Sequence, residues 1–386
     1  MHRQAPTPAT LWRSHLLRSS PCRRNSRSAW VDMACGGDGA RISLPPANRY
    51  SEKEVRLHSI EADVTSRRQA QKQERIFHGH NTTLPLSKAR LAVSPLSWAN
   101  DVLEDLGAEI SLQTCLSEAA SNGYAGIELG RKFPRDASVL RPLLENQGLA
   151  LASGWHSGQL AERSVEDEIA SVGDHAALLK AMGCSVLVYG EVAMMTPGAP
   201  FDAPMSRRLV MPTADRAAYS ARLTDFGKRL FDAYGLKLAY HHHLMMVAET
   251  FEEVSAVIGK AGPEAGLLLD TGHAAAAGFD YAKLIKRFGD RIVHIHLKDI
   301  RMAVHDDVRS KDLSFNDGVR NGLFTVPGDG VVDFDPVVRF VKDSAYTGWL
   351  VIEAEQDPAN APPKEYTAKA FEFIQMKFRG SPVEAG

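Results

Sequence analysis

Between residues 90 and 378 short apolar runs alternate with helix-length segments, and this alternation limits the possible folds more than any other feature. Eight runs have strand length and composition, near residues 91–96, 126–129, 149–153, 185–189, 236–240, 266–269, 291–297 and 349–352. The intervening helices are expected at 112–120, 138–146, 165–182, 215–234, 251–258, 281–288, 336–342 and 364–378. Eight such units predict an α/β fold, a (β/α)8 TIM barrel over residues 89–380, with its site at the carboxyl ends of the strands.

The main structural alternative is a doubly wound open sheet, which would carry a Gly-rich phosphate-binding turn after its first strand. The segment SPLSWAND at 94–101 is not such a turn. The chain has 386 residues, 44% hydrophobic and 24% charged, which is typical of a globular enzyme. No uncharged apolar run reaches the length of a membrane span, so no membrane partner is expected.

The first 88 residues are expected to form a mostly disordered N-terminal extension outside the barrel. Residues 1–31 contain six arginines and no acidic residue, a composition that resembles an organellar transit peptide. The alternative is a true start at Met33 or later, so that this segment is never made. Residues 1–90 carry a net charge of +9 and the rest −11, and the acidic part opposes nucleic-acid binding.

The four cysteines, at 22, 35, 115 and 184, show neither a CxxC pair nor zinc-ribbon spacing. This pattern favours a reducing compartment, and the cytoplasm is the expected location.

Metal-binding residue types gather where the sixth and seventh expected strands end. Asp270 and His273 follow one strand, and His294, His296 and Lys298 share one face of the next because side chains alternate along a strand. Any single histidine here is more often a core residue than a ligand. Several together at neighbouring strand ends predict a site.

Carboxylates and imidazoles without thiolates suit Mn²⁺, Co²⁺, Fe²⁺ or Zn²⁺, with the carboxylates favouring the harder ions. We expect Asp270, His296 and Glu353 to bind the metal, and His242 as a fourth ligand because Leu238, Tyr240 and His242 have the same strand parity. The other expected substrate-binding residues at strand ends are Trp98, Asn100, Glu128, Trp155, Glu191, His241, His273 and Glu355.

Other roles remain open for some of these residues. Glu128 can be a structural carboxylate at the barrel rim, and Trp98 and Trp155 can be rim packing. Lys298 can pair with Asp270 or carry out acid–base chemistry.

Several sequence blocks together resemble the myo-inosose-2 dehydratase family within the xylose isomerase-like barrels. They are LAVSPLSWAND, TCLSEAASNGYAGIELGRKFP, LASGWHS, VYGE, LAYHHHL, LLLDTGHA, IVHIHLKDIR, FTVPGDGVVDF and WLVIEAEQDP. The resemblance spans residues 91–378. It implies loss of water from 2-keto-myo-inositol to a trihydroxycyclohexane-dione in inositol catabolism, with Mn²⁺ or Co²⁺ and with glutathione. Related isomerases have a glutamate ligand at the end of the fifth strand, where this chain has YHHH.

Elimination of a hydroxyl β to a ketone needs a Lewis acid at the carbonyl oxygen, a base for the α-proton and an acid for the leaving hydroxide. Lys298, His156 and His242 are the candidate catalytic residues, in an order that the sequence leaves open. The expected partner is therefore a small polyol ketone, and a homo-oligomer is possible.

Three other functions compete with the dehydratase. A ketose isomerase or epimerase would share the first proton transfer but keep its hydroxyls. A DNA-repair endonuclease would need a basic face. A binding protein without catalysis would leave buried charges uncompensated.

Overall fold

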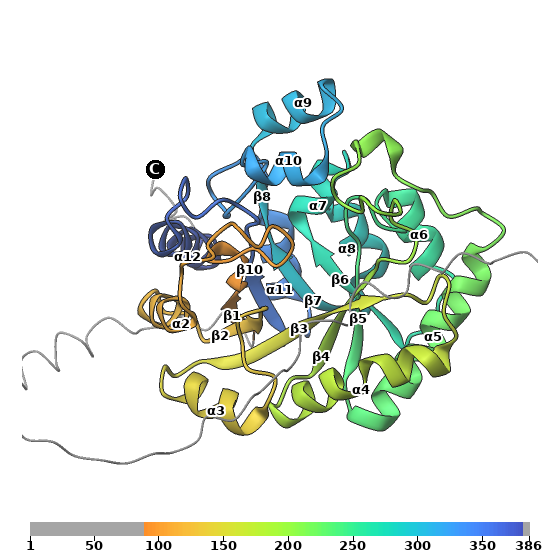
Figure 1. Cartoon of the computed structure of the whole chain (residues 1–386), viewed down its shortest axis with the longest axis horizontal. Coiled ribbons are helices and arrows are strands. Elements are labelled where there is room, and N and C mark those ends of the chain that lie inside the picture. Colours follow the sequence, from red (N-terminus) through yellow and green to blue (C-terminus); the bar gives the residue numbers. More distant parts are fainter. Residues whose placement is uncertain (1–88, 381–386) are drawn as a thin grey trace, which may run out of the picture. The chain divides into compact units, whose positions relative to one another are not determined.

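The computed structural model describes residues 89–380, which form a closed barrel of parallel strands surrounded by helices (Figure 1). The expected extension at 1–88 lies outside the described residues. Within the described part, no helix is long and apolar enough to cross a membrane.

Eight strands of the described chain close the barrel in the order β1-β10-β7-β6-β5-β4-β3-β2, and β1 and β2 pair to complete it. Every pairing around the barrel is parallel, so all carboxyl ends lie at one rim. The strands are β1 (Arg90–Val93), β2 (Gly126–Leu129), β3 (Ala150–Gly158), β4 (Val186–Glu191), β5 (Lys237–His241), β6 (Ala265–Asp270), β7 (Ile292–Leu297) and β10 (Trp349–Ile352). The predicted barrel is confirmed.

Helices follow the strands and cover the barrel, as the sequence predicts (Figure 1). They are α2 (Leu112–Ser121), α3 (Ala137–Glu145), α4 (Val165–Ala181), α5 (Arg216–Tyr234), α6 (Phe251–Ile258), α8 (Ala282–Phe288), α11 (Asp335–Asp343) and α12 (Pro363–Arg379). Side-chain oxygens of Ser111, Asp136, Ser164 and Thr250 cap the amino ends of α2, α3, α4 and α6. These caps satisfy backbone N–H groups that a helix start leaves unpaired.

The two faces of β5 have different surroundings, and this decides which side chains reach the barrel interior. Ala239 packs with Val188 and Leu268 of the neighbouring strands in a small interior cluster. Tyr240 instead contacts Tyr219 of α5, so its parity faces the helices. His241 follows the parity of Ala239 and points inward.

The structure differs from the predicted elements in several places. β1 ends at Val93, because a 3-10 turn begins at Pro95, whose ring lacks an N–H for the sheet. β3 runs on to Gly158, beyond the expected end at 153. The segment 301–329, where no helix or strand was predicted, contains α9 (Met302–Ser310), α10 (Phe315–Arg320) and β9 (Phe324–Thr325), and β9 pairs with β8 (Asp299–Ile300).

Candidate metal and catalytic site

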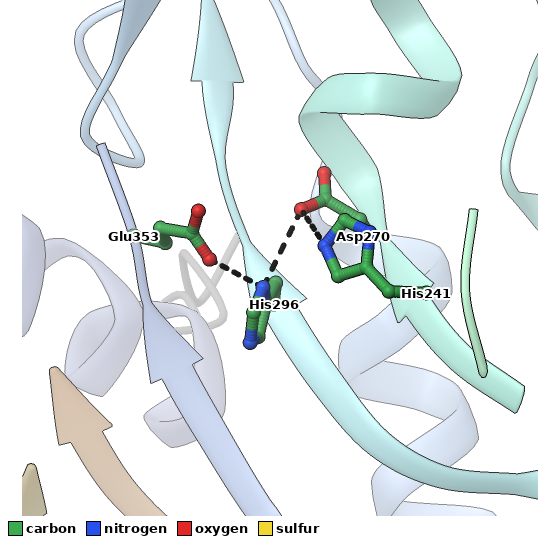
Figure 2. A group of neighbouring side chains, drawn as sticks. All are labelled: His241, Asp270, His296 and Glu353. Atoms are coloured by element: carbon green, nitrogen blue, oxygen red, sulfur yellow. Dashed lines mark ion pairs between the residues drawn. The ribbon is translucent and has the colours of Figure 1, made fainter. Parts of the chain in front are cut away.

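Four side chains from consecutive strand ends converge at the carboxyl rim of the barrel (Figure 2). They are His241 and Asp270, the last residues of β5 and β6, His296 on β7 and Glu353 directly after β10. One ligand atom of each lies within 4.8 Å of the others. Asp270 Oδ2 lies 3.5 Å from His241 Nε2 and 3.6 Å from His296 Nδ1. His296 Nδ1 also contacts Glu353 Oε2. We call these four residues the rim group.

Local structure fixes the orientation of the Asp270 carboxylate. It ends β6 and is the N-cap of the short helix α7 (Thr271–Ala276), where its Oδ1 accepts the backbone N–H of His273 at 2.7 Å. This bond uses one carboxylate oxygen and holds the other, Oδ2, toward the rim group. The helix cap thus orients a ligand atom.

The rim group lacks hydrogen bonds where they would be expected. Asp270 Oδ2, His296 Nδ1 and Glu353 Oε2 are buried, and none has a hydrogen-bond partner among the described residues. Buried polar atoms are nearly always satisfied, and oxygen and nitrogen lone pairs that face one another need a positive charge between them. The donor set therefore fits a divalent cation of the kind that binds imidazole and carboxylate.

Electrostatics also indicate a shortage of positive charge. Burial alone would lower the pKa of His296, but the carboxylates of Glu353 and Glu128 outweigh it and raise that pKa well above its usual value. Without a cation, these carboxylates thus favour an extra proton on His296. A metal ion would supply the missing charge.

Lys298 lies beside the rim group but does not face the cavity. Its ammonium is fully buried, donates to Glu355 Oε1 at 2.8 Å and forms an ion pair with Glu353 Oε1 at 2.9 Å. It also lies 2.8 Å from His273 Nε2. Burial would lower the pKa of Lys298, yet these carboxylates and Asp270 raise it. Lys298 is therefore a buried cation that holds the carboxylates of Glu353, in the rim group, and of Glu355 beside it.

A second buried group lies on the other side of His296. Glu128 Oε1 lies 2.9 Å from His294 Nε2 and 3.1 Å from His296 Nε2, and it also accepts the Ser153 hydroxyl. Burial would raise the pKa of Glu128, but the two histidines lower it well below its usual value. Glu128 is therefore ionised and contacts one member of the rim group.

A cavity of about 160 Å³ opens in front of the rim group. Its polar wall includes Glu128, His241, His296, Glu353, Glu355 and His243. Trp155, Phe201 and Phe315 supply apolar surface. Gly190 leaves room for the indole of Trp155, because a Cβ at that position would lie 2.0 Å from its Cη2 atom. A concave site with aromatic walls and converging polar groups is typical of small-molecule binding.

Comparison with known proteins shows which family the chain resembles. The family described as "Xylose isomerase-like TIM barrel" matches residues 116–376. The rhizopine catabolism protein MocC of Rhizobium meliloti is 42% identical over 75% of this chain and 88% of that relative. Inosose dehydratase 2 of Bacillus cereus is 39% identical over 75% of this chain and 97% of the relative.

The chain belongs to the inosose dehydratase family. A Clostridium perfringens inosose dehydratase also matches, at 37% identity over 75% of this chain and 98% of its own. Family membership identifies the chain as a carbon–oxygen lyase of the hydro-lyase class.

Solved structures confirm the barrel. The IOLI protein with a bound zinc atom has a TM-score of 0.55 and 17% identity, over 75% of this chain and 98% of that one. The probable 3-DHS dehydratase AsbF from Bacillus anthracis also scores 0.55, at 15% identity over 74% and 99%. At such identities the likeness shows the fold alone.

Within the inosose dehydratase fold, the structure brings together most of the predicted site residues. Asp270, His296 and Glu353 converge as expected. Asn100, Glu128, Trp155, His241 and Glu355 line the cavity. His273 lies behind it, against Lys298 and Glu355.

The expected fourth ligand is corrected. His242 points away from the rim group, with its ring 6.0 Å from Phe279, and its Nε2 accepts the backbone N–H of Asp270 at 3.1 Å. His241 takes the expected place, because the parity shared by Leu238, Tyr240 and His242 faces the helices and not the interior.

Three other predicted residues lie outside the cavity. His156 Nε2 contacts Glu168 of α4 at 2.6 Å, and its ring stacks on Phe226. Trp98 is buried and donates to Glu118 of α2 at 2.7 Å. Glu191 accepts the hydroxyl of Tyr189 at 2.8 Å, on the helix side of β4.

Several cavity residues were not predicted from the sequence. His243 belongs to the YHHH block, and its position two residues after His241 on the inward parity was the available signal. Phe201 and Phe315 come from the two long segments after β4 and after β8. These segments have no alternating strand pattern from which the direction of a side chain could be predicted. The placement of the two side chains depends on packing between those segments, since the ring centroids of Phe201 and Phe315 lie 4.9 Å apart.

Proposed function

We propose that this member of the inosose dehydratase family is a divalent-metal-dependent enzyme that removes water from 2-keto-myo-inositol to give a trihydroxycyclohexane-1,2-dione in inositol catabolism. The observation that carries the proposal is the rim group, in which three buried ligand atoms lack hydrogen bonds at the wall of a cavity. The assignment of the substrate is supported by inosose dehydratases of which 97% and 98% of the length match this chain.

His241, Asp270, His296 and Glu353 would hold the metal. When bound, it would act as a Lewis acid that draws electron density from the ketone oxygen and so acidifies the neighbouring C–H bond. The reaction then breaks that C–H bond and the C–O bond of the β-hydroxyl, and the proton and hydroxide leave as water. The chain's own residues must move both protons.

Glu355 and His243 are the best-placed groups for these proton transfers. Both line the cavity, and Glu355 Oε1 lies 4.0 Å from His243 Nε2. The Nδ1–H of His243 donates to Leu244 O at 2.6 Å, which leaves Nε2 as the nitrogen on the Glu355 side. One of these two residues would act as the base that takes the α-proton, and the other as the acid that protonates the leaving hydroxide.

The proposed roles of the three expected catalytic residues change accordingly. His156 and His242 contact helix and backbone groups outside the cavity. The Lys298 ammonium is fully buried between Glu353 and Glu355. We therefore assign Lys298 a positioning role toward these two carboxylates, and it acts on substrate only through them.

The metal is proposed to be Mn²⁺ or Co²⁺, since two of the four ligands are carboxylates. A glutathione requirement, a homo-oligomeric state and a cytoplasmic location remain predictions. They rest on the family resemblance and the composition.

The test is an assay on 2-keto-myo-inositol with metal-stripped enzyme and with enzyme reconstituted with Mn²⁺ or Co²⁺. The product should weigh one water less than the substrate and absorb in the ultraviolet as a dione, only in the metal-loaded sample. A product of unchanged mass would instead identify an isomerase or epimerase. Full activity in the stripped enzyme would refute the metal requirement.

A further inference from the structure

Glu128 has a hydrogen-bond arrangement that substrate binding does not explain. A single oxygen of its carboxylate, Oε1, is approached by His294 Nε2, His296 Nε2 and the hydroxyl of Ser153. All four residues are buried. Three donors on one oxygen hold this carboxylate in a fixed position despite its burial.

These contacts determine which nitrogen of His296 is free. Glu128 Oε1 already accepts the Ser153 hydroxyl, so it acts as an acceptor, and His296 at 3.1 Å donates its Nε2–H to it. The lone pair is then available at Nδ1, which is the atom that faces Asp270 Oδ2 and Glu353 Oε2. A ring with the opposite tautomer would turn an N–H bond toward the proposed cation.

We infer that Glu128 is a positioning residue that keeps His296 in the Nε2–H tautomer and thereby sets the affinity of the rim group for its cation. His294 and Ser153 hold the same oxygen of Glu128 from the barrel interior. The inference rests on the metal site of the proposed function and adds a carboxylate–histidine–metal chain to it. Partners of this type orient the ring and raise its strength as a ligand.

The inference is tested by calorimetric titration of metal-free protein with Co²⁺, in the absence of substrate. Wild-type protein should bind one ion. Glu128→Ala, which removes the acceptor, should bind it about 10- to 100-fold more weakly. Glu128→Gln keeps an amide oxygen that can accept from His296, so its affinity should lie between the two.

Glu118→Gln is the matched control. It also alters a carboxylate that accepts an aromatic N–H, that of Trp98 at 2.7 Å, but on α2 and away from the cavity. Its Co²⁺ affinity should equal that of the wild type. Thermal unfolding of each metal-free variant checks that the fold is retained. If Glu128→Ala does not fold, the Co²⁺ affinity of Glu128→Gln alone tests the inference.

A second readout follows the tautomer directly. In the Zn²⁺-loaded protein, ¹⁵N spectra of the histidine rings should place the remaining His296 proton on Nε2, and Glu128→Gln should shift that signal. A substrate-binding role would leave both the ring signal and the metal affinity unchanged and would raise only KM.

The outcomes separate this inference from the proposed function. Wild-type affinity in the folded Glu128 variants would overturn the inference and leave the metal site standing. A wild-type protein that binds no Co²⁺ would overturn both.

Discussion

The backbone N–H of Asp270 donates to Nε2 of His242 at 3.1 Å, so the histidine predicted as a metal ligand instead holds the backbone at the end of β6. Its neighbour His241 faces the opposite way and brings Nε2 to 3.5 Å from Asp270 Oδ2. Two adjacent histidines at the end of β5 therefore have different surroundings, and substitution can distinguish their roles.

We predict that His241→Asn lowers Co²⁺ or Mn²⁺ affinity at least tenfold, because it removes one of four ligand atoms. His242→Asn should retain the affinity and lose only about 1–3 kcal/mol of stability, through the unpaired backbone donor. Calorimetric metal titration and urea unfolding of both variants measure the two effects. The reverse pattern would restore His242 as the ligand.

Lys298→Met should abolish turnover but retain the metal. The substitution leaves Glu353 and Glu355 without their buried cation, so the metal-free protein should lose about 3–5 kcal/mol of unfolding free energy. Lys298 supplies no metal ligand, so the bound metal, measured by atomic absorption, should match the wild type. Unchanged turnover would contradict the assigned role.

Gly190→Ala should impair substrate binding. A Cβ at this position would lie 2.0 Å from Cη2 of Trp155, so the indole must leave its place in the cavity wall. We expect a several-fold higher KM with metal affinity unchanged. Gly173→Ala in α4 is the control, since its Cβ would meet only the hydroxyl of Tyr234 at 3.5 Å, and its KM should stay at the wild-type value.

Glu191 should make stability depend on pH. Burial raises its pKa from 4.5 to about 7, although Tyr189 and two backbone N–H groups stabilise the charge. The folded protein thus keeps a proton that the unfolded chain releases, so this contribution to stability falls as pH rises from about 4.5 to 7 and is constant above.

Glu191→Gln removes this dependence. The difference in unfolding free energy between variant and wild type should therefore move in favour of the variant by on the order of 3 kcal/mol between pH 4.5 and 8. Urea unfolding at both pH values gives this difference, and any constant offset from the new amide cancels. A difference that does not change with pH would place the Glu191 pKa near its ordinary value.

Metal addition should stabilise the fold. A ligand that binds only the native state contributes about 2.7 kcal/mol at one hundred times its Kd, which corresponds to roughly 4–5 °C in Tm for a domain of this size. Differential scanning fluorimetry with Mn²⁺ and with a chelator measures the shift. Asp270→Asn should remove this shift, because the substitution takes a negative charge and a ligand oxygen without a hydrogen bond out of the rim group.

The order of strands and helices followed from local sequence patterns. Apolar runs such as 126–129 gave the strand bounds as the structure has them, and helix 251–258 was predicted to the residue. Asp270, His296 and Glu353 could be placed together because the carboxyl ends of parallel strands meet at one rim.

Which face of a strand points into the barrel depended on tertiary contacts. Parity along β5 separates two sets of side chains, but only packing against α5 decides which set faces the helices, and Tyr240 turns out to be in that set. The register also shifts by one residue between Leu267 and Leu268 where β6 pairs with β7, so parity could not be carried across the sheet.

The sequence by itself therefore determined the barrel, its rim and most of the residues that meet there, since these depend on short-range periodicity and on strand order. Only the tertiary structure decided that His241 faces the rim group, that Lys298 is buried between carboxylates and that Glu128 joins His296. These depend on contacts between residues as much as 168 positions apart, and no local pattern encodes them.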